Sequence, residues 1–177
     1  MRLFIAIDLD DEKAYFAEMQ DKLRNIDGSL SFPKSFHITL RFIGEFDENK
    51  ADIIKNAMKS VAFRQFDIFL SGIGIFPNEK YIKIIWIGAK PTEKINMLKN
   101  EIDKALEQLN FKPYKSFKVH ITLARVKSIS YKKPLLECIS SLHSDEKKIS
   151  VKSFKLIKST LTPEGPRYED IAVFYSS

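Results

Sequence analysis

The chain repeats one order of expected strands and helices, and this repeat restricts the folds open to it. In the first half, hydrophobic periodicity predicts alternating strands and helices over 2–9, 11–26, 36–43, 47–62 and 66–76. The second half follows the same plan over 81–88, 92–109, 117–126, a helix starting near Pro134, and 149–158. The offset of about 80 residues is too long for a solenoid and suits a two-lobed duplication.

The joins between these elements favour an α+β fold class. The hairpin-like join Pro77-Asn78-Glu79-Lys80, and a last strand over 168–175 behind the turn Thr162-Pro163-Glu164-Gly165-Pro166, favour a mixed α+β sandwich over a fully parallel sheet. No linker or low-complexity segment marks a boundary. We therefore expect a single bilobal domain over 1–177, with the internal duplication dividing it at approximately 1–77 and 78–177.

Composition is that of an ordinary globular protein from a reducing compartment. Apolar residues make up 44% and charged residues 29%, far from the composition of disordered chains. Cys138 is the single cysteine, so no intramolecular disulfide can form, which favours a cytoplasmic location. The apolar start of the chain ends at Asp8, too short for a signal peptide or a membrane span. A net charge of +6 modestly favours polyanionic partners such as nucleic acid, although charge alone identifies none.

The tetrapeptide His-Ile-Thr-Leu occurs twice, at 37–40 and 120–123, in the equivalent strand of each half. Because side chains alternate across a strand, each copy displays a His and a Thr about 7 Å apart on one face and buries aliphatic residues on the other. A single copy is more often a satisfied strand histidine beside a β-favouring threonine. Two copies at equivalent places indicate a functional pair, His37 with Thr39 and His120 with Thr122.

These four side chains provide what phosphodiester cleavage requires. A base must deprotonate the nucleophile, an acid must protonate the leaving oxygen, and donors must hold the phosphoryl oxygens as charge builds. Two imidazoles can supply acid and base near neutral pH, and two threonine hydroxyls can supply the donors. Because in-line displacement puts nucleophile and leaving group on opposite sides of phosphorus, acid and base are expected on opposite walls of a groove.

The segments around both motifs resemble the 2H phosphoesterase superfamily, and more narrowly the RNA 2′,3′-cyclic phosphodiesterases, also called 2′-5′ RNA ligases. Beyond the paired His-x-Thr-x motifs, the resemblance is carried by residues 1–8, 40–45, 72–77, 86–88, 120–125 and 161–166, so it extends over essentially the whole chain. It implies a bilobal, pseudo-twofold fold in which two mainly antiparallel sheets face a central, positively lined cleft with helices outside.

The resemblance also implies an activity, the hydrolysis of a terminal 2′,3′-cyclic phosphate on RNA, or of a cyclic nucleotide, to a 2′-phosphate without a metal or other cofactor. It implies His37 as proton donor and His120 as proton acceptor, although the two motifs are too alike for the sequence itself to assign these roles. Thr39 and Thr122 match the phosphate-contacting threonines of such enzymes. Arg125 matches a substrate-binding arginine that follows the second motif.

The two arginines beside the motifs raise a difficulty of strand parity. Strict alternation puts Arg125 on the face opposite His120, so its implied role requires the strand to end or twist there, or the side chain to reach around. Arg41 has the right parity beside His37 but matches no family role.

Other candidates have plainer interpretations. His143 has no Thr two places later and is expected on a surface loop, and three histidines without i, i+4 helical spacing give no credible metal site. Residues 72–74 lack the spacing of a phosphate loop and suggest close backbone packing. Membership of apolar strands makes the core a better expectation than base stacking for Phe4, Phe36, Phe42 and Trp86.

Two other functions stay open at this point. A 2′-5′ RNA ligase would open the same cyclic phosphate with a ribose hydroxyl in place of water, using the same acid and base. A non-catalytic RNA-end-binding protein would need the pocket but not two titrating groups. We expect a monomer that acts on RNA and does not bind a membrane.

Overall fold

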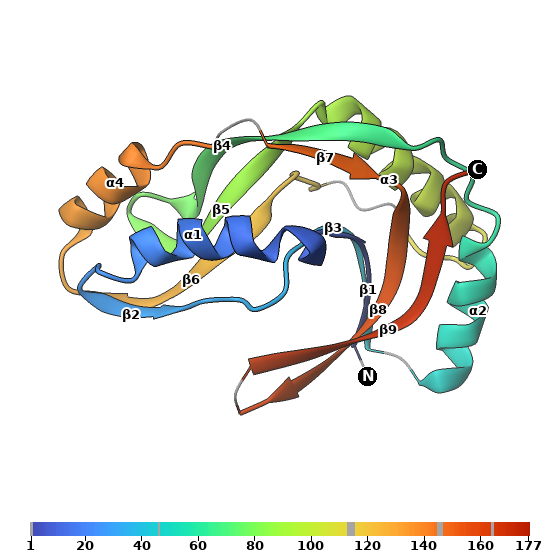
Figure 1. The fold of residues 1–177 in the computed structure, drawn as a ribbon. Coiled ribbons are helices and arrows are strands. Elements are labelled where there is room, and N and C mark those ends of the chain that lie inside the picture. The colour runs from blue at the N-terminus through green and yellow to red at the C-terminus, as the bar shows by residue number, and fades with distance from the viewer. Residues whose placement is uncertain (1, 46, 113–115, 145–146, 164) are drawn as a thin grey trace.

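Two antiparallel sheets form the body of the computed structural model, which describes residues 2–45, 47–112, 116–144, 147–163 and 165–177 (Figure 1). Sheet A has the strand order β3 (His37–Glu45), β1 (Arg2–Asp8), β8 (Ser153–Thr162), β9 (Gly165–Tyr175). Sheet B has the order β2 (Gly28–Ser31), β6 (Ile121–Ile129), β5 (Tyr81–Lys90), β4 (Phe66–Asn78), β7 (Lys148–Val151). Met1 of the first resembling segment and Glu164 of the expected turn lie outside the described residues.

The two sheets share one strand order. The order β3-β1-β8-β9 in sheet A corresponds position by position to β6-β5-β4-β7 in sheet B, with β2 added beside β6. The two histidine motifs fall at the same place in this order, because the first opens β3 and the second leads into β6. The expected α+β class with two mainly antiparallel sheets is confirmed.

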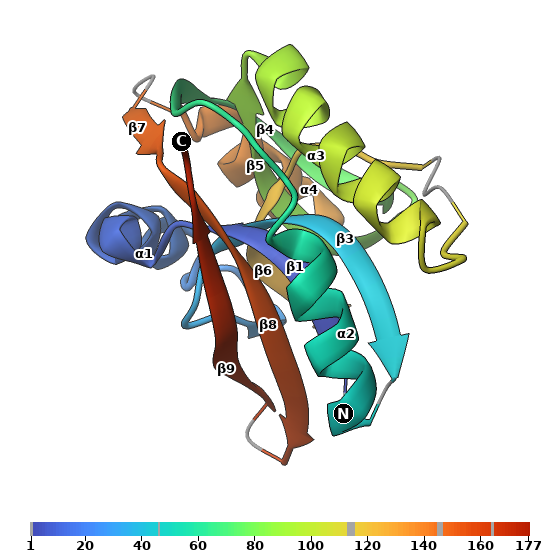
Figure 2. The same ribbon diagram turned by 90° about the vertical axis from the view of Figure 1, so that its right-hand side faces the viewer.

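In the described part of the chain, four α-helices pack around the sheets, α1 (Lys13–Leu23), α2 (Glu48–Met58), α3 (Thr92–Glu107) and α4 (Lys132–Ser141). Helices α1 and α4 contact sheet B, whereas α2 and α3 contact each other and sheet A. Figure 2 shows α2 and α3 side by side. None of the helices in the described ranges has the length and apolar character needed to span a membrane.

The helical spacing of apolar residues explains why α3 packs as it does. Its buried side chains recur at intervals of three and four, which places them on one stripe, and they include Ile95, Leu98, Ile102 and Leu106. The main core that receives this stripe runs through both sheets and all four helices. A separate small cluster of Phe4, Ala6 and Ile157, with Tyr168 against it, lies on the other face of sheet A.

Three expectations about the strands needed correction. The strand expected over 149–158 is two strands, β7 and β8, which belong to different sheets and are separated at Lys152. The short strand β2 was not expected, because its four residues carry no apolar alternation. The strand expected over 117–126 begins at Ile121, so His120 lies in the extended segment just before it.

Candidate active site

His37 opens β3 and is held between two aromatic rings of sheet A. Its ring centroid lies 5.1 Å from that of Phe4 and 5.4 Å from that of Tyr168, which meets it edge-on. His37 and Thr39 are half-buried whereas Ile38 and Leu40 are fully buried in the core. The alternation expected from the sequence therefore places the histidine and the threonine on the face of sheet A opposite the core.

A carboxylate pair fixes the backbone that leads into His37. Asp8 pairs with His37 across the β1–β3 ladder, and its Oδ1 accepts a hydrogen bond from the Asp10 backbone N–H. Asp10 Oδ1 in turn accepts the Phe36 N–H at 2.7 Å. Lys155 of β8 donates to Asp8 and forms an ion pair with Asp170 at 2.8 Å, so one ammonium group partly neutralises two carboxylates beside His37.

His120 has a corresponding aromatic support on sheet B. Its ring lies edge-on to Phe76 at 5.1 Å and to Trp86 at 6.5 Å between centroids. Its Nδ1 is 2.8 Å from the Lys118 carbonyl oxygen, a contact that an Nδ1–H donates in the neutral ring. That tautomer leaves Nε2 with a lone pair, which is the requirement for accepting a proton.

Trp86 can lie where it does because residue 74 is glycine. A Cβ added at Gly74 would be 2.1 Å from Trp86 Cζ2, well inside van der Waals contact. The indole therefore lies directly over the β4 backbone and fills the space behind Phe76 and His120. The sequence expectation of close backbone packing at residues 72–74 holds at Gly74.

A β-bulge in β6 turns Arg125 toward the histidine side. The β5–β6 register passes from Trp86 opposite Thr122 to Ile85 opposite Ala124, so Leu123 is an extra residue. Leu123 and Ala124 are both fully buried, and Arg125 is exposed. Because an extra residue shifts the alternation by one, Thr122 and Arg125 face the same side. Strict alternation therefore predicted the wrong face of the strand for Arg125.

A corresponding bulge in β3 turns Arg41 into the core. The expectation that Arg41 lies on the same face as His37 was therefore also wrong. Ala6 is opposite Thr39 and Ile5 is opposite Arg41, which leaves Leu40 as the extra residue. Arg41 is 7% exposed and lies 3.4 Å from the Asp103 carboxylate, which also pairs with Lys99 at 2.6 Å. Arg41 Nη2 donates to the Lys112 carbonyl.

The electrostatic surroundings of His37 include groups from both sheets. The pKa of His37 is lowered from 6.5 to about 4, mainly because the ring is buried; Arg125 and His120 act in the same direction, whereas Asp10 and Asp8 oppose it. Strands β3 and β6 are also in contact. Groups from both sheets therefore lie near one another at the His37 imidazole, and a pKa of about 4 favours the neutral ring at pH 7.

Burial raises the pKa of Tyr168, and the charge of Arg125 opposes that effect, so the β9 tyrosine also borders this region. Sequence reasoning missed Tyr168, Phe76 and the Asp8–Lys155 pair. The signal that was available is an aromatic residue in the strand after the Gly165-Pro166 turn.

The aromatic candidates from the sequence separate into three environments. Phe36 is buried against Phe16 with the rings stacked at 4.5 Å, and Phe4 is buried beneath His37. Phe42 was expected in the core but is 63% exposed, with its ring 6.2 Å from that of Phe4. The bulge at Leu40 turns Phe42 to the histidine side, where it offers an open aromatic face.

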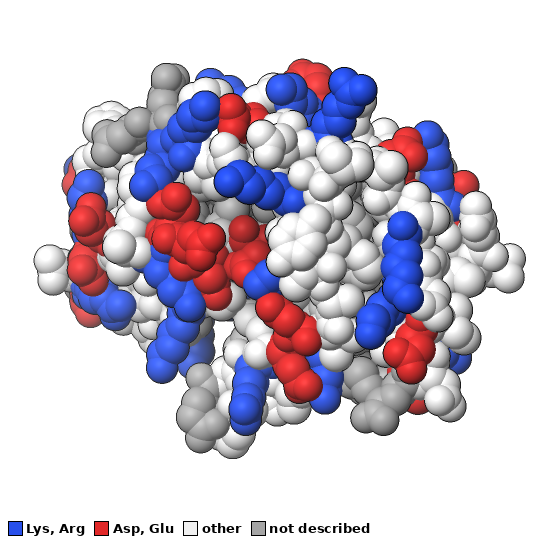
Figure 3. Space-filling view, turned by 45° about the vertical axis from the view of Figure 1, so that its right-hand side comes forward, with Lys and Arg blue, Asp and Glu red and all other residues white. Residues whose placement is uncertain are grey.

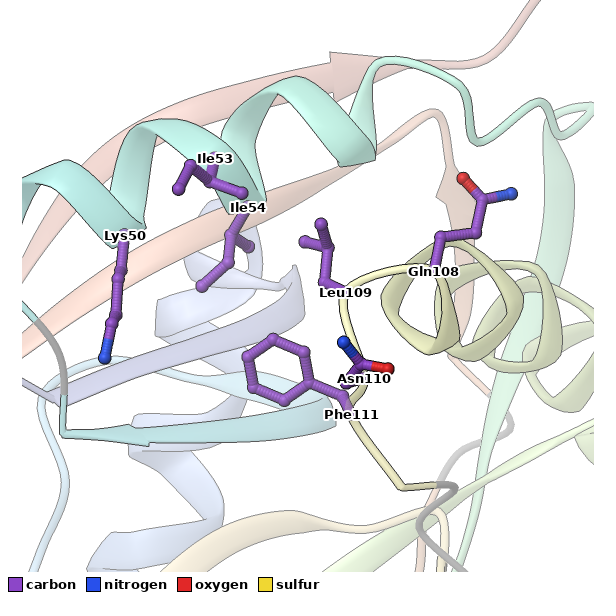
Figure 4. Close-up of a pocket in the computed structure, with 7 residues that line it drawn as sticks. All are labelled: Lys50, Ile53, Ile54, Gln108, Leu109, Asn110 and Phe111. Atoms are coloured by element: carbon purple, nitrogen blue, oxygen red, sulfur yellow. The ribbon is translucent and has the colours of Figure 1, made fainter.

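The remaining candidates lie away from the histidines. His143 is exposed, as expected, and Cys138 is half-buried with its thiol 3.4 Å from the Lys22 carbonyl oxygen. Within the described ranges, no three His, Cys, Asp or Glu side chains gather as metal ligands. A pocket of about 430 Å³ between α2 and the end of α3 is lined by Lys50, Ile53, Ile54, Gln108, Leu109, Asn110 and Phe111, none of them a candidate site residue (Figure 4).

The fold and the paired motifs together are those of a 2H phosphoesterase, with a His and a Thr in β3 and the same pair at the beginning of β6. The family model for LigT-like phosphoesterases matches the chain twice, over residues 7–86 and 87–168. The chain belongs to this family.

Similar proteins extend over nearly the full length. RNA 2′,3′-cyclic phosphodiesterases from Methanocaldococcus jannaschii and Archaeoglobus fulgidus are 40% and 36% identical, over 97% and 98% of this chain and 98% and 99% of theirs. A crystal structure of a Thermus thermophilus protein superimposes with a TM-score of 0.83 at 27% identity, covering 99% of this chain and 97% of that one. Escherichia coli LigT complexed with 3′-AMP has the same fold, with a TM-score of 0.79 at 21% identity and coverage of 99% and 98%.

Proposed function

We propose that this chain is an RNA 2′,3′-cyclic phosphodiesterase that converts a terminal 2′,3′-cyclic phosphate to a 2′-phosphomonoester, with His37 and His120 as its acid/base pair. The observation that carries the proposal is the pairing of a His and a Thr in β3 and at the beginning of β6, two corresponding strands that contact one another. The names of the full-length relatives support the same substrate.

The proposed reaction is an in-line displacement at phosphorus. His120 Nε2, freed by the Nδ1 contact with the Lys118 carbonyl, takes a proton from water as the water oxygen bonds to phosphorus. The bond from phosphorus to O3′ breaks, and His37 gives its proton to that oxygen. The phosphate stays on O2′.

Hydroxyl groups and one cation stabilise the transition state in this proposal. Thr39 and Thr122 donate hydrogen bonds to the non-bridging phosphoryl oxygens, where negative charge builds. Arg125, exposed on the same side as Thr122, adds a positive charge that binds the substrate.

The donor role of His37 requires it to gain a proton when substrate binds. A pKa of about 4 leaves the imidazole neutral at pH 7 in the free protein. An anionic phosphate placed beside the ring favours the charged form and raises that pKa. We infer that substrate binding raises the pKa of His37 enough for the imidazole to take up a proton from solvent.

The proposal needs no metal, and one experiment tests substrate, product and metal together. RNA ending in a 2′,3′-cyclic phosphate is incubated with the purified protein, with and without EDTA, and the product end is identified. We expect a 2′-phosphate at an unchanged rate in EDTA. A 3′-phosphate, a rate abolished by EDTA, joined RNA ends, or bound but intact substrate would each contradict the proposal, the last two in favour of a ligase or an RNA-end-binding protein.

We also propose that the chain works as one two-lobed monomer in a reducing compartment such as the cytoplasm. The repeated strand order and the two successive family matches support an internal duplication, divided at approximately 77. The main core joins both sheets, which favours a single cooperative unit. Light scattering of the purified protein tests the monomer, since a stable dimer would double the mass.

A further inference from the structure

We propose that a strip at the end of sheet B, formed by Lys80, Tyr81, Lys127, Tyr131 and Lys132, binds the single-stranded RNA that precedes the cyclic phosphate. The inference rests on the proposed function and extends it from the terminal nucleotide to the body of the substrate. It names a polynucleotide, rather than a cyclic mononucleotide, as the substrate that the protein binds best.

The strip continues the histidine face of sheet B beyond Arg125. Val126 is buried in the core and Lys127 is exposed, so Lys127 faces the same side as Arg125 and lies about 7 Å further along the strand. Ile84 of β5 is opposite Arg125, and the chain from Ile84 back to Tyr81 runs beside β6 in the same direction. Tyr81 therefore lies about 10 Å beyond the level of Arg125.

A hydrogen bond brings the beginning of α4 to this place. Lys132 Nζ donates to the Lys80 carbonyl oxygen at 2.6 Å, which ties the first turn of α4 to the β4–β5 hairpin. Asn78 Oδ1 accepts the backbone N–H groups of Lys80 and Tyr81 at 3.0 and 3.1 Å and fixes the hairpin turn. Lysines and tyrosines from two segments distant in sequence are thus held together.

The strip combines the two features that bind single-stranded nucleic acid. Tyr81 is 60% exposed and Tyr131 is 69% exposed, so a base can reach both rings, although Lys80 lies over one face of Tyr81. Lys80 Nζ lies 5.7 Å from the Tyr81 ring centroid, near enough to hold a phosphate beside a stacked base. Cation and aromatic ring side by side fit a nucleotide better than either does alone.

The distribution of charge favours binding of the RNA along sheet B rather than along sheet A. Lys80, Lys127 and Lys132 form no ion pair with a carboxylate among the described residues, although Glu79 is exposed in the same hairpin. At the corresponding end of sheet A two cations are neutralised, Arg2 by Glu45 at 3.0 Å and Lys158 by Glu169 at 3.2 Å, and among the described residues Arg167 is left there without an ion pair. The face shown in Figure 3 likewise mixes both signs of charge. A polyanion therefore gains more by following sheet B.

A comparison of two substrates tests the strip. Hydrolysis of a 2′,3′-cyclic mononucleotide is measured beside that of an RNA of roughly eight nucleotides with the same end, a length that matches common single-strand site sizes. The variant Tyr81→Ala/Lys127→Gln is compared with Tyr175→Ala/Lys59→Gln, which removes an exposed tyrosine and an exposed lysine elsewhere.

We expect the strip variant to raise KM for the RNA about five- to tenfold while leaving the mononucleotide kinetics unchanged, and the control variant to change neither. The dependence of log KM on log salt should fall by about one unit for the lost lysine. An unchanged KM for the RNA, or equal losses on both substrates, would overturn the inference.

The failure of the proposed function is a separate result. If the wild type hydrolysed neither substrate, the function would be wrong, and the strip would be judged by fluorescence anisotropy with labelled RNA. Binding weakened only in the strip variant would still support it, and equal binding by both variants would reject it.

Discussion

Phe42 and Arg125 stand five residues after His37 and His120, respectively, and both face the histidine side because a β-bulge precedes each of them. The bulges fall at Leu40 and Leu123, the last residue of each His-Ile-Thr-Leu motif. One local irregularity, present in both sheets, therefore places an aromatic ring on the histidine side of sheet A and a guanidinium group on the histidine side of sheet B.

Arg125→Met and Arg41→Met should have opposite effects. Arg125→Met should lower kcat/KM by roughly tenfold or more with little change in unfolding free energy, because the side chain is exposed beside the site. Arg41→Met should lower the unfolding free energy by about 3 kcal/mol, because it breaks a buried ion network. Urea denaturation measures the stability of both variants, and steady-state kinetics measure their activity. A loss of stability in Arg125→Met and a loss of activity alone in Arg41→Met would contradict the positions of the two bulges.

The threonine hydroxyls should contribute to rate rather than to folding. Thr39→Val and Thr122→Val keep the shape of the side chain and remove the donor, so each should reduce kcat by about a hundredfold. Thr→Ser at either position keeps the hydroxyl and should restore most of the activity. A valine variant with wild-type kcat would remove that threonine from the site.

His37 should make the protein less stable in acid. Its pKa is 6.5 ordinarily and about 4 in the folded protein, so the unfolded chain binds more protons between these values and stability falls as pH falls from 6.5 to 4. His37→Gln should flatten the fall measured by urea denaturation, whereas His143→Gln, at an exposed position, should leave it unchanged. Identical pH slopes for the wild type and His37→Gln would argue against the low pKa.

Inorganic phosphate should raise the pKa of His37. A bound anion beside a buried imidazole stabilises the charged form. NMR titration of the histidine signals with and without phosphate measures this shift, with His143 as an internal reference. A His37 signal whose midpoint stays near 4 with phosphate bound would remove the basis for its role as proton donor.

Gly74→Ala should disturb the support of His120 from a distance. The added methyl would overlap the Trp86 indole, so we expect a loss of about 1–3 kcal/mol in unfolding free energy together with reduced turnover. Adding Trp86→Leu to Gly74→Ala should recover part of the stability without recovering turnover. No loss in the single variant would mean that the indole can move freely.

Hydrophobic periodicity was sufficient to predict most elements and the two histidine faces. Alternation within His-Ile-Thr-Leu predicts which face each side chain takes. Ile38 and Ile121 are buried in the core, so the His and Thr on either side of each isoleucine face away from it. The repeated plan then identified the equivalent strands. Both conclusions depend on local sequence, which alternation captures well.

The sheet to which each strand belongs and the positions of the bulges could not be predicted from hydrophobic alternation. Residues 149–158 read as one strand because each part alternates correctly, yet Lys152 separates parts that pair with different sheets. The bulges at Leu40 and Leu123 depend on register with the neighbouring strand, so strict alternation misplaced Arg41, Phe42 and Arg125. Partners such as Tyr168 come from the far end of the chain and have no local signal.

The most direct test is the rate at which His37→Ala and His120→Ala hydrolyse a 2′,3′-cyclic nucleotide, with folding of each variant verified by circular dichroism. If the two imidazoles serve one phosphorus atom, each variant should remain folded and lose turnover by about a thousandfold or more. Full turnover by either folded variant would contradict the shared site.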